Sequence, residues 1–338
     1  MLNQTLEKVS RREDLSRDEM SAAIGAIVDG ACPQTQMAGL LIGLRVKGEA
    51  VNELLGAAAA LHERAIKLSP DTRPDLDTVG TGGDGSGSLN LSTAAALVAA
   101  GAGLKVAKCG SRSISSQCGA ADVLAALGVP IDLTPDQASE AIATTGFGFL
   151  FGPLYHPAMK QVAPVRRELG VRTMFNLLGP LTNVANVRAK LVGVYHPSRL
   201  ELLASALAEA GIERALVVSS PIGLDEIAPC GVTHVIEVSG GEQRRYTVSP
   251  EDFDLQPQPL ESIKGGAPEL NARLLTEVLT GRDVPARTGV LLNAAAGLFA
   301  AGAARDLRDA ARQAAHIIDS GRAMAALDAA RSVRVLAA

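Results

Sequence analysis

Aromatic residues are scarce in this sequence. It has no tryptophan, and aromatic side chains make up only 3% of its 338 residues. The hydrophobic residues, 47% of the chain, must therefore be mainly small or aliphatic, and the 34 glycines and several alanine-rich stretches fit this picture. Small side chains let helices and strands approach one another closely. We predict a compact, helix-rich α/β protein whose length allows two domains of ordinary size.

Long hydrophobic runs are also missing. The longest run of small apolar residues, 94–107, is broken by glycines and a lysine and is too short to cross a bilayer. The first residues, MLNQTLEKVSRRED, mix both charges and lack the apolar segment of a secretory signal. We therefore expect a cytoplasmic protein with no membrane partner.

Neither positive charge nor cysteine is abundant. The formal net charge of −4 argues against a general nucleic-acid surface, which needs a basic face to displace counterions, although a local basic pocket remains possible. The four cysteines are Cys32, Cys109, Cys118 and Cys230. They form no CxxC pair and lack metal-ligand spacing, so we interpret them as reduced thiols.

Residues 1–70 are predicted to form a helical domain. Ser16 and Glu19 match a capping box before an apolar run, and Gly30 closes that run. Two more helices are expected at 37–46 and 51–66. Their faces carry alanine and glycine, which favours tight packing, either within the domain or against a second copy of the chain.

Residues 75–338 change to a strand–loop–helix pattern. Short strands are predicted at 76–79 and 104–107, and Thr134 with Gln137 marks the start of a helix. A strand at 190–195, a helix at 198–210 with Ser198 and Glu201 as its capping box, and a strand at 215–219 form one βαβ unit. Such a unit implies parallel strands, so we predict an α/β domain with a mostly parallel central sheet.

The clearest local motif is GTGGDGSGSLNLST, from Gly80 to Thr93. It follows a predicted strand and opens a helix, where backbone N–H groups bind anions. Gly80, Gly82 and Gly85 also fit the dinucleotide fingerprint, but the region about 20 residues on offers lysines in place of the required acidic residue. A plain glycine turn is the third interpretation. Phosphate binding explains the added hydroxyl groups best.

A second polar loop, KCGSRSISS, runs from Lys108 to Ser116. Its two basic side chains and four serines suit a ligand with several oxyanions, whereas a solvated serine-rich loop is the alternative. Two neighbouring loops of this kind favour a ligand with phosphates at both ends.

An acidic pair, Asp225–Glu226, follows the strand predicted at 215–219. Ligands of open α/β sheets gather at the carboxyl ends of strands, and Mg²⁺ binds through one or two carboxylates plus substrate phosphates. Taken alone, the pair would more often be solvated surface residues. The two loops upstream favour a magnesium site.

The segment VAPVRRELGVRTMFNLLGPLTN, residues 162–183, contains arginines that could clamp a carboxylate. For Arg167 and Arg172 we prefer a surface position. No His/Ser/Asp or His/Cys arrangement is recognisable, so we expect no covalent nucleophile.

These elements, in this order, resemble the anthranilate phosphoribosyltransferases of tryptophan biosynthesis, from the N-terminal helices to about residue 300. The most specific motifs are GTGGDGSGSLNLST and VRRELGVRTMFNLLGPLTN. The resemblance implies a small N-terminal helical domain, with a later contribution from about 165–187, and a larger α/β domain. It also implies a homodimer formed through the helical part, with phosphoribosyl pyrophosphate (PRPP) and Mg²⁺ bound between the domains.

The resemblance also implies a set of site residues. PRPP would contact Gly80, Gly83, Asp84, Ser88, Asn90, Leu91, Ser92, Thr93, Lys108, Ser111, Arg112, Ser113, Ser115, Ser116 and the position of Ala120. Magnesium would be held by Ser92, Asp225 and Glu226, and the anthranilate carboxylate by Arg166. The catalytic residues would be Lys108, Asp225 and Glu226. Lys108, the backbone N–H groups and the Mg²⁺ held by the two carboxylates would neutralise the departing pyrophosphate.

The chain departs from the family in the second loop, which usually reads Lys-His-Gly-Asn-Arg-Ser. Here Cys109 and Ser111 replace the histidine and the asparagine, which contacts anthranilate, and Ala120 replaces a usual serine. Three other functions therefore remain open: use of another aromatic amine, a related nucleoside phosphorylase activity, and a non-enzymatic role in nucleic-acid binding.

Overall fold

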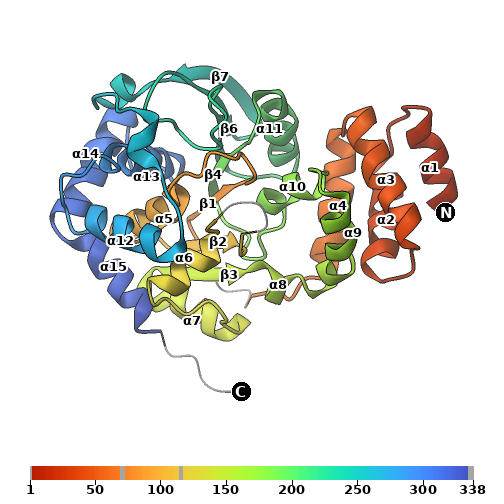
Figure 1. Cartoon of the computed structure of the whole chain (residues 1–338), viewed down its shortest axis with the longest axis horizontal. Coiled ribbons are helices and arrows are strands. Elements are labelled where there is room, and N and C mark those ends of the chain that lie inside the picture. Colours follow the sequence, from red (N-terminus) through yellow and green to blue (C-terminus); the bar gives the residue numbers. More distant parts are fainter. Residues whose placement is uncertain (1, 69–72, 114–116, 334–338) are drawn as a thin grey trace.

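The structure is a computed structural model that describes residues 2–68, 73–113 and 117–333. Its N-terminal region is a bundle of four helices, drawn in red and orange in Figure 1. The helices are α1 (Leu2–Ser10), α2 (Arg17–Val28), α3 (Gln34–Lys47) and α4 (Val51–Glu63). The Ser16 hydroxyl accepts the Glu19 N–H and the Glu19 carboxylate accepts the Ser16 N–H, which confirms the predicted capping box. The helix expected at 51–66 ends three residues earlier, at Glu63.

A seven-stranded sheet forms the centre of the larger domain. Its strands are β1 (Leu76–Gly80), β2 (Val106–Gly110), β3 (Phe147–Phe151), β4 (Ala189–Gly193), β5 (Arg214–Ser219), β6 (Thr233–Ser239) and β7 (Glu242–Val248). They lie in the order β3-β2-β1-β4-β5-β6-β7. The first five are parallel and the last two antiparallel, so the predicted mostly parallel sheet is confirmed.

Eleven further α-helices lie in the described part of the larger domain. They are α5 (Leu91–Gly101), α6 (Ala120–Ala126), α7 (Pro135–Thr145), α8 (Gly152–Tyr155), α9 (Ala163–Leu169), α10 (Phe175–Leu178), α11 (Leu200–Glu209), α12 (Pro268–Leu279), α13 (Arg287–Ala300), α14 (Leu307–Asp319) and α15 (Arg322–Arg331). The capping box of Thr134 and Gln137 at α7 is confirmed.

The capping box predicted from Ser198 and Glu201 is wrong. Pro197 starts a 3₁₀ turn, Pro197–Arg199, and the Ser198 N–H donates to the His196 ring at 3.2 Å. Helix α11 therefore begins only at Leu200. The βαβ unit itself is confirmed, because β4 and β5 are adjacent and parallel.

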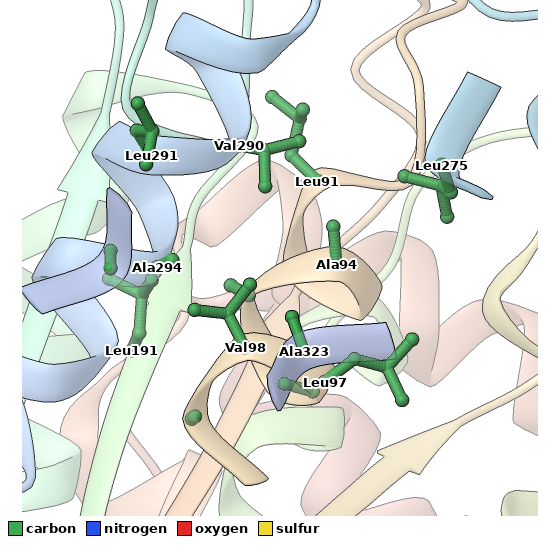
Figure 2. Close-up of a cluster of buried hydrophobic side chains, with 14 of the residues drawn as sticks. Leu91, Ala94, Leu97, Val98, Leu191, Leu275, Val290, Leu291, Ala294 and Ala323 are labelled. Atoms are coloured by element: carbon green, nitrogen blue, oxygen red, sulfur yellow. The ribbon is translucent and has the colours of Figure 1, made fainter. Parts of the chain in front are cut away.

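One face of the sheet is covered by α5 and by α12–α15 (Figure 1). Figure 2 shows a part of this core, in which alanine and branched aliphatic side chains of α5 and α13 lie close together above Leu191 of β4. Because aromatic side chains are few, the core is filled by small and aliphatic side chains of helices that approach one another closely. At Gly101 of α5 an added Cβ would lie 2.9 Å from the Arg322 carbonyl oxygen.

The other face of the sheet shares its hydrophobic core with the N-terminal bundle. Val79 of β1 and Val192 of β4 belong to the same buried cluster as Met20 and Leu54 of the bundle. Helix α9 packs against α3 within this region (Figure 1). The carboxyl ends of β1 and β4 therefore lie where the bundle meets the sheet. No helix in the described residues is long and apolar enough to span a membrane.

Candidate active site

The glycine-rich loop leaves the carboxyl end of β1 along a path that only glycine adopts easily. Gly82, Gly83, Gly85 and Gly87 have φ angles of +68°, +69°, +76° and +62°. These angles lie in the left-handed region, where a Cβ atom is disfavoured. The loop is anchored at its start, where the Thr81 N–H donates to the Gly193 carbonyl of β4 at 2.9 Å. The motif therefore forms a backbone cradle whose shape favours glycine at these positions.

Asp225 lies directly over this loop. Its Oδ2 atom accepts the Gly82 N–H at 2.7 Å, and a Cβ added to Gly80 would come within 2.6 Å of the same oxygen. The Asp225 N–H lies 3.5 Å from Asp84 Oδ2. Burial, reinforced by the Asp84 charge, raises the pKa of Asp225 to about 7. The structure thus brings together three residues that the sequence singled out: Gly80, Asp84 and Asp225.

Glu226 reaches the start of α5. Its Oε1 atom accepts the Ser92 N–H at 2.9 Å, so this amide of the helix N-terminus is already paired with a carboxylate. Its Oε2 atom is buried and has no hydrogen-bond partner among the described residues. Burial, followed by the Asp225 charge, raises the pKa of Glu226 well above its ordinary value. Two buried carboxylates with an unpaired oxygen fit a hard divalent cation, which would offset their charge.

Lys108 lies beneath the loop and is only 1% exposed. Its Nζ atom donates to the Thr78 carbonyl at 2.5 Å and to the Ser92 hydroxyl at 3.3 Å. Burial lowers the pKa of this ammonium group, while the charges of Asp77 and Glu226 oppose the shift. Lys108 therefore connects the middle of β1 with the first turn of α5.

Asn90 and Thr93 complete the first turn of α5. The Asn90 side chain bonds the Cys118 carbonyl at 3.3 Å and the Asn271 amide at 2.9 Å. The Thr93 hydroxyl is buried and has no partner among the described residues. Leu91 is fully buried, so its side chain belongs to the core and only its backbone can face a ligand. Ser88 is held by the Ser86 hydroxyl at 3.0 Å.

The second loop starts later than the sequence indicated, because Lys108 to Gly110 form the end of β2. Asp122 organises the residues after this strand: it accepts the N–H groups of Ser113 and Gly119 and pairs with Arg112, each at 2.9 Å. Ser111 is exposed, and the position of Ala120 starts α6. The predicted contacts Ser115 and Ser116 lie outside the described residues.

Arg166 is a half-buried cation on α9 without a carboxylate partner in the part of the chain that the structure describes. Its guanidinium carbon lies 5.6 Å from the centre of the Phe175 ring. Burial lowers its pKa, which indicates an incompletely solvated charge. Arg167 is exposed, as expected. Arg172 is half-buried and stacks on Tyr195 at 4.2 Å, in contrast to the surface position that we expected.

A cleft of about 340 Å³ lies beside this site, between the bundle and the sheet. Arg45 and Glu49 line it from the bundle, and Tyr195 and Arg199 from the sheet side. The Tyr195 N–H donates to the Thr81 hydroxyl at 3.0 Å, so the cleft adjoins the glycine loop. None of the predicted site residues lines it. Since Arg199 is paired with Glu49 at 2.8 Å, we regard the cleft as part of the domain junction.

The sequence interpretation missed three buried polar residues under the site: Asp77, Asn183 and Lys190. A signal was available for two of them. Asp77 and Lys190 are charged residues inside short apolar strands, LDTVG and AKLVG, and charges are rarely buried without a partner. Asn183, the last residue of the second motif, gave no such signal.

Two family models match the chain. Residues 3–65 match the helical bundle domain of a glycosyl transferase family, and residues 72–324 match the α/β domain of that family. The two matches together cover most of the chain and correspond to the bundle and to the sheet-containing region.

Individual relatives carry a more specific name. The anthranilate phosphoribosyltransferase of Rhodopseudomonas palustris is 50% identical over 321 residues, which is 95% of this chain and 94% of the relative. The solved anthranilate phosphoribosyltransferase of Thermus thermophilus superposes with a TM-score of 0.92 at 44% identity, covering 97% of this chain and 98% of that one. The enzyme from Saccharomyces cerevisiae, solved in complex with PRPP and Mg, has a TM-score of 0.86 at 28% identity, covering 97% and 96%.

Proposed function

The chain belongs to the anthranilate phosphoribosyltransferase family, and from this premise we propose that it transfers ribose 5-phosphate from PRPP to anthranilate and releases pyrophosphate. One observation supports this most directly. The buried carboxylates of Asp225 and Glu226, one with an oxygen that has no partner among the described residues, meet the glycine loop at the carboxyl edge of the sheet. Such an edge is where phosphorylated ligands bind in open α/β folds.

We propose that the pyrophosphate of PRPP lies against the glycine loop, from Gly80 and Gly83 to Asp84 and Ser88. The second loop, with Arg112 and Ser113, would take the phosphate at the other end. The left-handed glycine backbone of the first loop supports this assignment, because a backbone without side chains can approach a phosphate closely. In the second loop, Asp122 holds Arg112 in place, so a phosphate would have to share this arginine or displace it.

Mg²⁺ would be held by Asp225, Glu226 and the Ser92 hydroxyl, and it would supply positive charge to the leaving pyrophosphate. The chain prepares this site in two ways. Gly82 and Ser92 each orient one carboxylate through a backbone N–H, and Lys108 holds the Ser92 hydroxyl at 3.3 Å. A dependence of activity on Mg²⁺ is thus part of the proposal.

The acceptor half needs little acid–base chemistry. An aromatic amine is neutral and nucleophilic near pH 7, so the protein has to position it against C1′ of PRPP and exclude water. We propose that Arg166 binds the anthranilate carboxylate, because its buried charge has no carboxylate partner among the described residues. Ser111 would be the nearest polar contact from the second loop.

We also propose a cytoplasmic homodimer formed through the N-terminal bundle. Val46 at the end of α3 is 67% exposed and Val171 after α9 is 42% exposed, although both are apolar. Helices α3 and α9 pack together, so these side chains belong to one side of the molecule. Sedimentation at tens of micromolar, a typical range for a moderate-affinity interface, should give twice the chain mass. A monomer at that concentration would argue against the dimer.

The activity itself is tested by incubating the protein with PRPP, Mg²⁺ and anthranilate and measuring the phosphoribosylated product and pyrophosphate. Asp225→Asn and Glu226→Gln should each reduce turnover strongly with the fold retained, since metal neutralisation is typically worth several kcal/mol. Phosphate with a nucleoside tests the phosphorylase alternative. Salt-dependent DNA binding without turnover would favour the non-enzymatic alternative.

A further inference from the structure

Asp77 is a fully buried carboxylate in β1, and its hydrogen-bond partners differ from those of Asp225 and Glu226. Its Oδ1 atom accepts the Cys109 N–H of β2 at 3.3 Å, and its Oδ2 atom accepts the Asn183 side-chain amide at 2.8 Å. The Lys190 ammonium group of β4 lies 3.9 Å from Oδ2. Asp77 therefore links β2, β4 and the end of the motif 162–183 through one side chain.

Lys190 is itself only 6% exposed and makes a second contact. Its Nζ atom donates to the Pro180 carbonyl at 2.6 Å. Burial lowers the pKa of Lys190, whereas the Asp77 charge opposes this shift. A buried carboxylate without a cation nearby is costly, so the Lys190 ammonium group, 3.9 Å from Oδ2, helps to stabilise Asp77 in this position, where it accepts two hydrogen bonds.

The segment around Pro180 is fixed at three successive carbonyl groups. Lys190 binds the first, while the next two, of Leu181 and Thr182, lie 2.9 and 2.8 Å from the Nε2 atoms of His62 and His156. These three side chains come from β4, from α4 and from the residue after α8. The backbone of this segment is thus held by nitrogen atoms from separate parts of the fold.

We propose that Lys190 is a positioning residue that sets the geometry of the acceptor half of the site. This inference rests on the proposed function, in which Ser111 and Arg166 are the acceptor contacts. Ser111 follows β2, which Asp77 holds at Cys109, and Arg166 belongs to the motif whose far end Lys190 and Asn183 hold. Lys190 therefore connects the two acceptor-bearing segments, although it touches neither substrate.

The donor half has hydrogen bonds of its own, although the charge of Asp77 also acts on Lys108. The glycine loop is held by Asp225 and by Gly193, and the first turn of α5 by Glu226. None of the hydrogen bonds of Lys190 reaches these groups. Loss of Lys190 should therefore affect the acceptor much more than PRPP.

The test compares Lys190→Met, Lys190→Gln and Lys47→Met in the full-length protein. Lys47 is the matched control: its side chain is 3% exposed and pairs at 3.1 Å with the buried Glu53 of the bundle. Lys190→Met should raise the KM for anthranilate about tenfold, the scale of a lost charge-assisted hydrogen bond, and change the KM for PRPP less than about twofold. Lys190→Gln keeps an N–H donor and should recover part of the loss.

Hydrogen exchange gives a readout that does not depend on the acceptor's identity. The amides of Cys109 and Ala185, which donate to Asp77 and to the Asn183 side chain, should exchange faster in Lys190→Met and not in Lys47→Met. If the parent protein does not convert anthranilate, the proposed function fails while this measurement still decides the positioning role.

Three results would overturn the proposal. The first is a parallel rise in the KM values for anthranilate and PRPP in Lys190→Met. The second is a fall in melting temperature in Lys190→Met with both KM values unchanged, as expected for Lys47→Met. The third is unchanged exchange at Cys109 and Ala185. Should Lys190→Met fail to fold, the same comparison is made with Lys190→Gln, whose neutral side chain is polar and better tolerated.

Discussion

Gly193 and Asp225 touch so closely that a Cβ atom built on Gly193 would lie 1.5 Å from the Asp225 carbonyl oxygen. Gly193 ends β4, and its own carbonyl accepts the Thr81 N–H at the start of the glycine loop. One glycine thus supports both the phosphate loop and the carboxylate pair. The absence of a side chain at the end of β4 therefore lets the proposed metal ligands lie against the proposed phosphate loop.

Gly193→Ala should therefore displace Asp225 and reduce turnover at least about 100-fold, because loss of a metal ligand is worth several kcal/mol. Steady-state kinetics with PRPP and anthranilate would measure this. Gly39→Ala on α3 is the control, since its added Cβ would meet only Leu6 at an ordinary 3.5 Å. Full activity in Gly193→Ala would show that the Asp225 segment can move without cost.

The raised pKa of Asp225 predicts an unusual pH dependence of stability in the presence of a chelator. Its pKa is about 7 when folded against a reference value of 3.8, so the folded state holds this proton more tightly. The resulting stabilisation is present below about pH 4 and is lost as the pH rises through 7. Asp225→Asn removes this loss.

The melting temperature of Asp225→Asn relative to the parent should therefore rise from pH 4 to pH 8. Added Mg²⁺ at pH 8 should stabilise the parent and reduce the difference. A difference that stays constant across this range would mean that Asp225 is not a buried acid with a raised pKa.

PRPP with Mg²⁺ should raise the melting temperature of the protein, while NAD should not. A ligand present at 100 times its Kd stabilises the native state by about 2.7 kcal/mol. Protection by NAD alone would restore the dinucleotide interpretation of Gly80, Gly82 and Gly85, which the structure makes less attractive because Glu226 occupies the Ser92 amide of the following helix.

The backbone path of the glycine loop could be predicted from the sequence for a physical reason. A backbone cradle needs glycine at fixed positions, and the positive φ angles at Gly82 and Gly83 are therefore visible in the residue type. The pairing of Asp225 with this loop also followed from its place after a strand. Local patterns were less reliable where a neighbouring side chain offers another hydrogen bond. Ser198 was expected to cap a helix, but its N–H donates to the His196 ring and it lies within a 3₁₀ turn.

The supports of the acceptor half could not be predicted in the same way. Asp77, Asn183 and Lys190 meet across three separated segments, and nothing in the sequence near any one of them specifies its partners. Their hydrogen bonds depend on strand order, which places β1 between β2 and β4. A charged residue inside an apolar strand predicts that a partner exists, but only the fold identifies it.

The second loop leads to the last prediction, which concerns the acceptor. Cys109 is a neutral thiol, since burial raises its pKa to about 12, and Ser111 offers one short hydroxyl in place of an amide. A poorly made hydrogen bond costs on the order of 1 kcal/mol, so anthranilate should bind roughly five- to tenfold more weakly than with His and Asn at these positions. Cys109→His with Ser111→Asn should therefore lower the KM for anthranilate and leave that for PRPP nearly unchanged.

Arg166→Ala should have the opposite effect on the same measurement, with a large loss of anthranilate use and little change in PRPP binding. The exposed Arg167 of the same helix provides the control, and Arg167→Ala should change neither KM. An unaltered KM in the double variant would remove Cys109 and Ser111 from the acceptor site, and a silent Arg166→Ala would remove the carboxylate contact. If neither the parent nor the double variant converts anthranilate while PRPP still protects the fold, the acceptor is a different aromatic amine, because none of these three residues belongs to the glycine loop or to the proposed metal ligands.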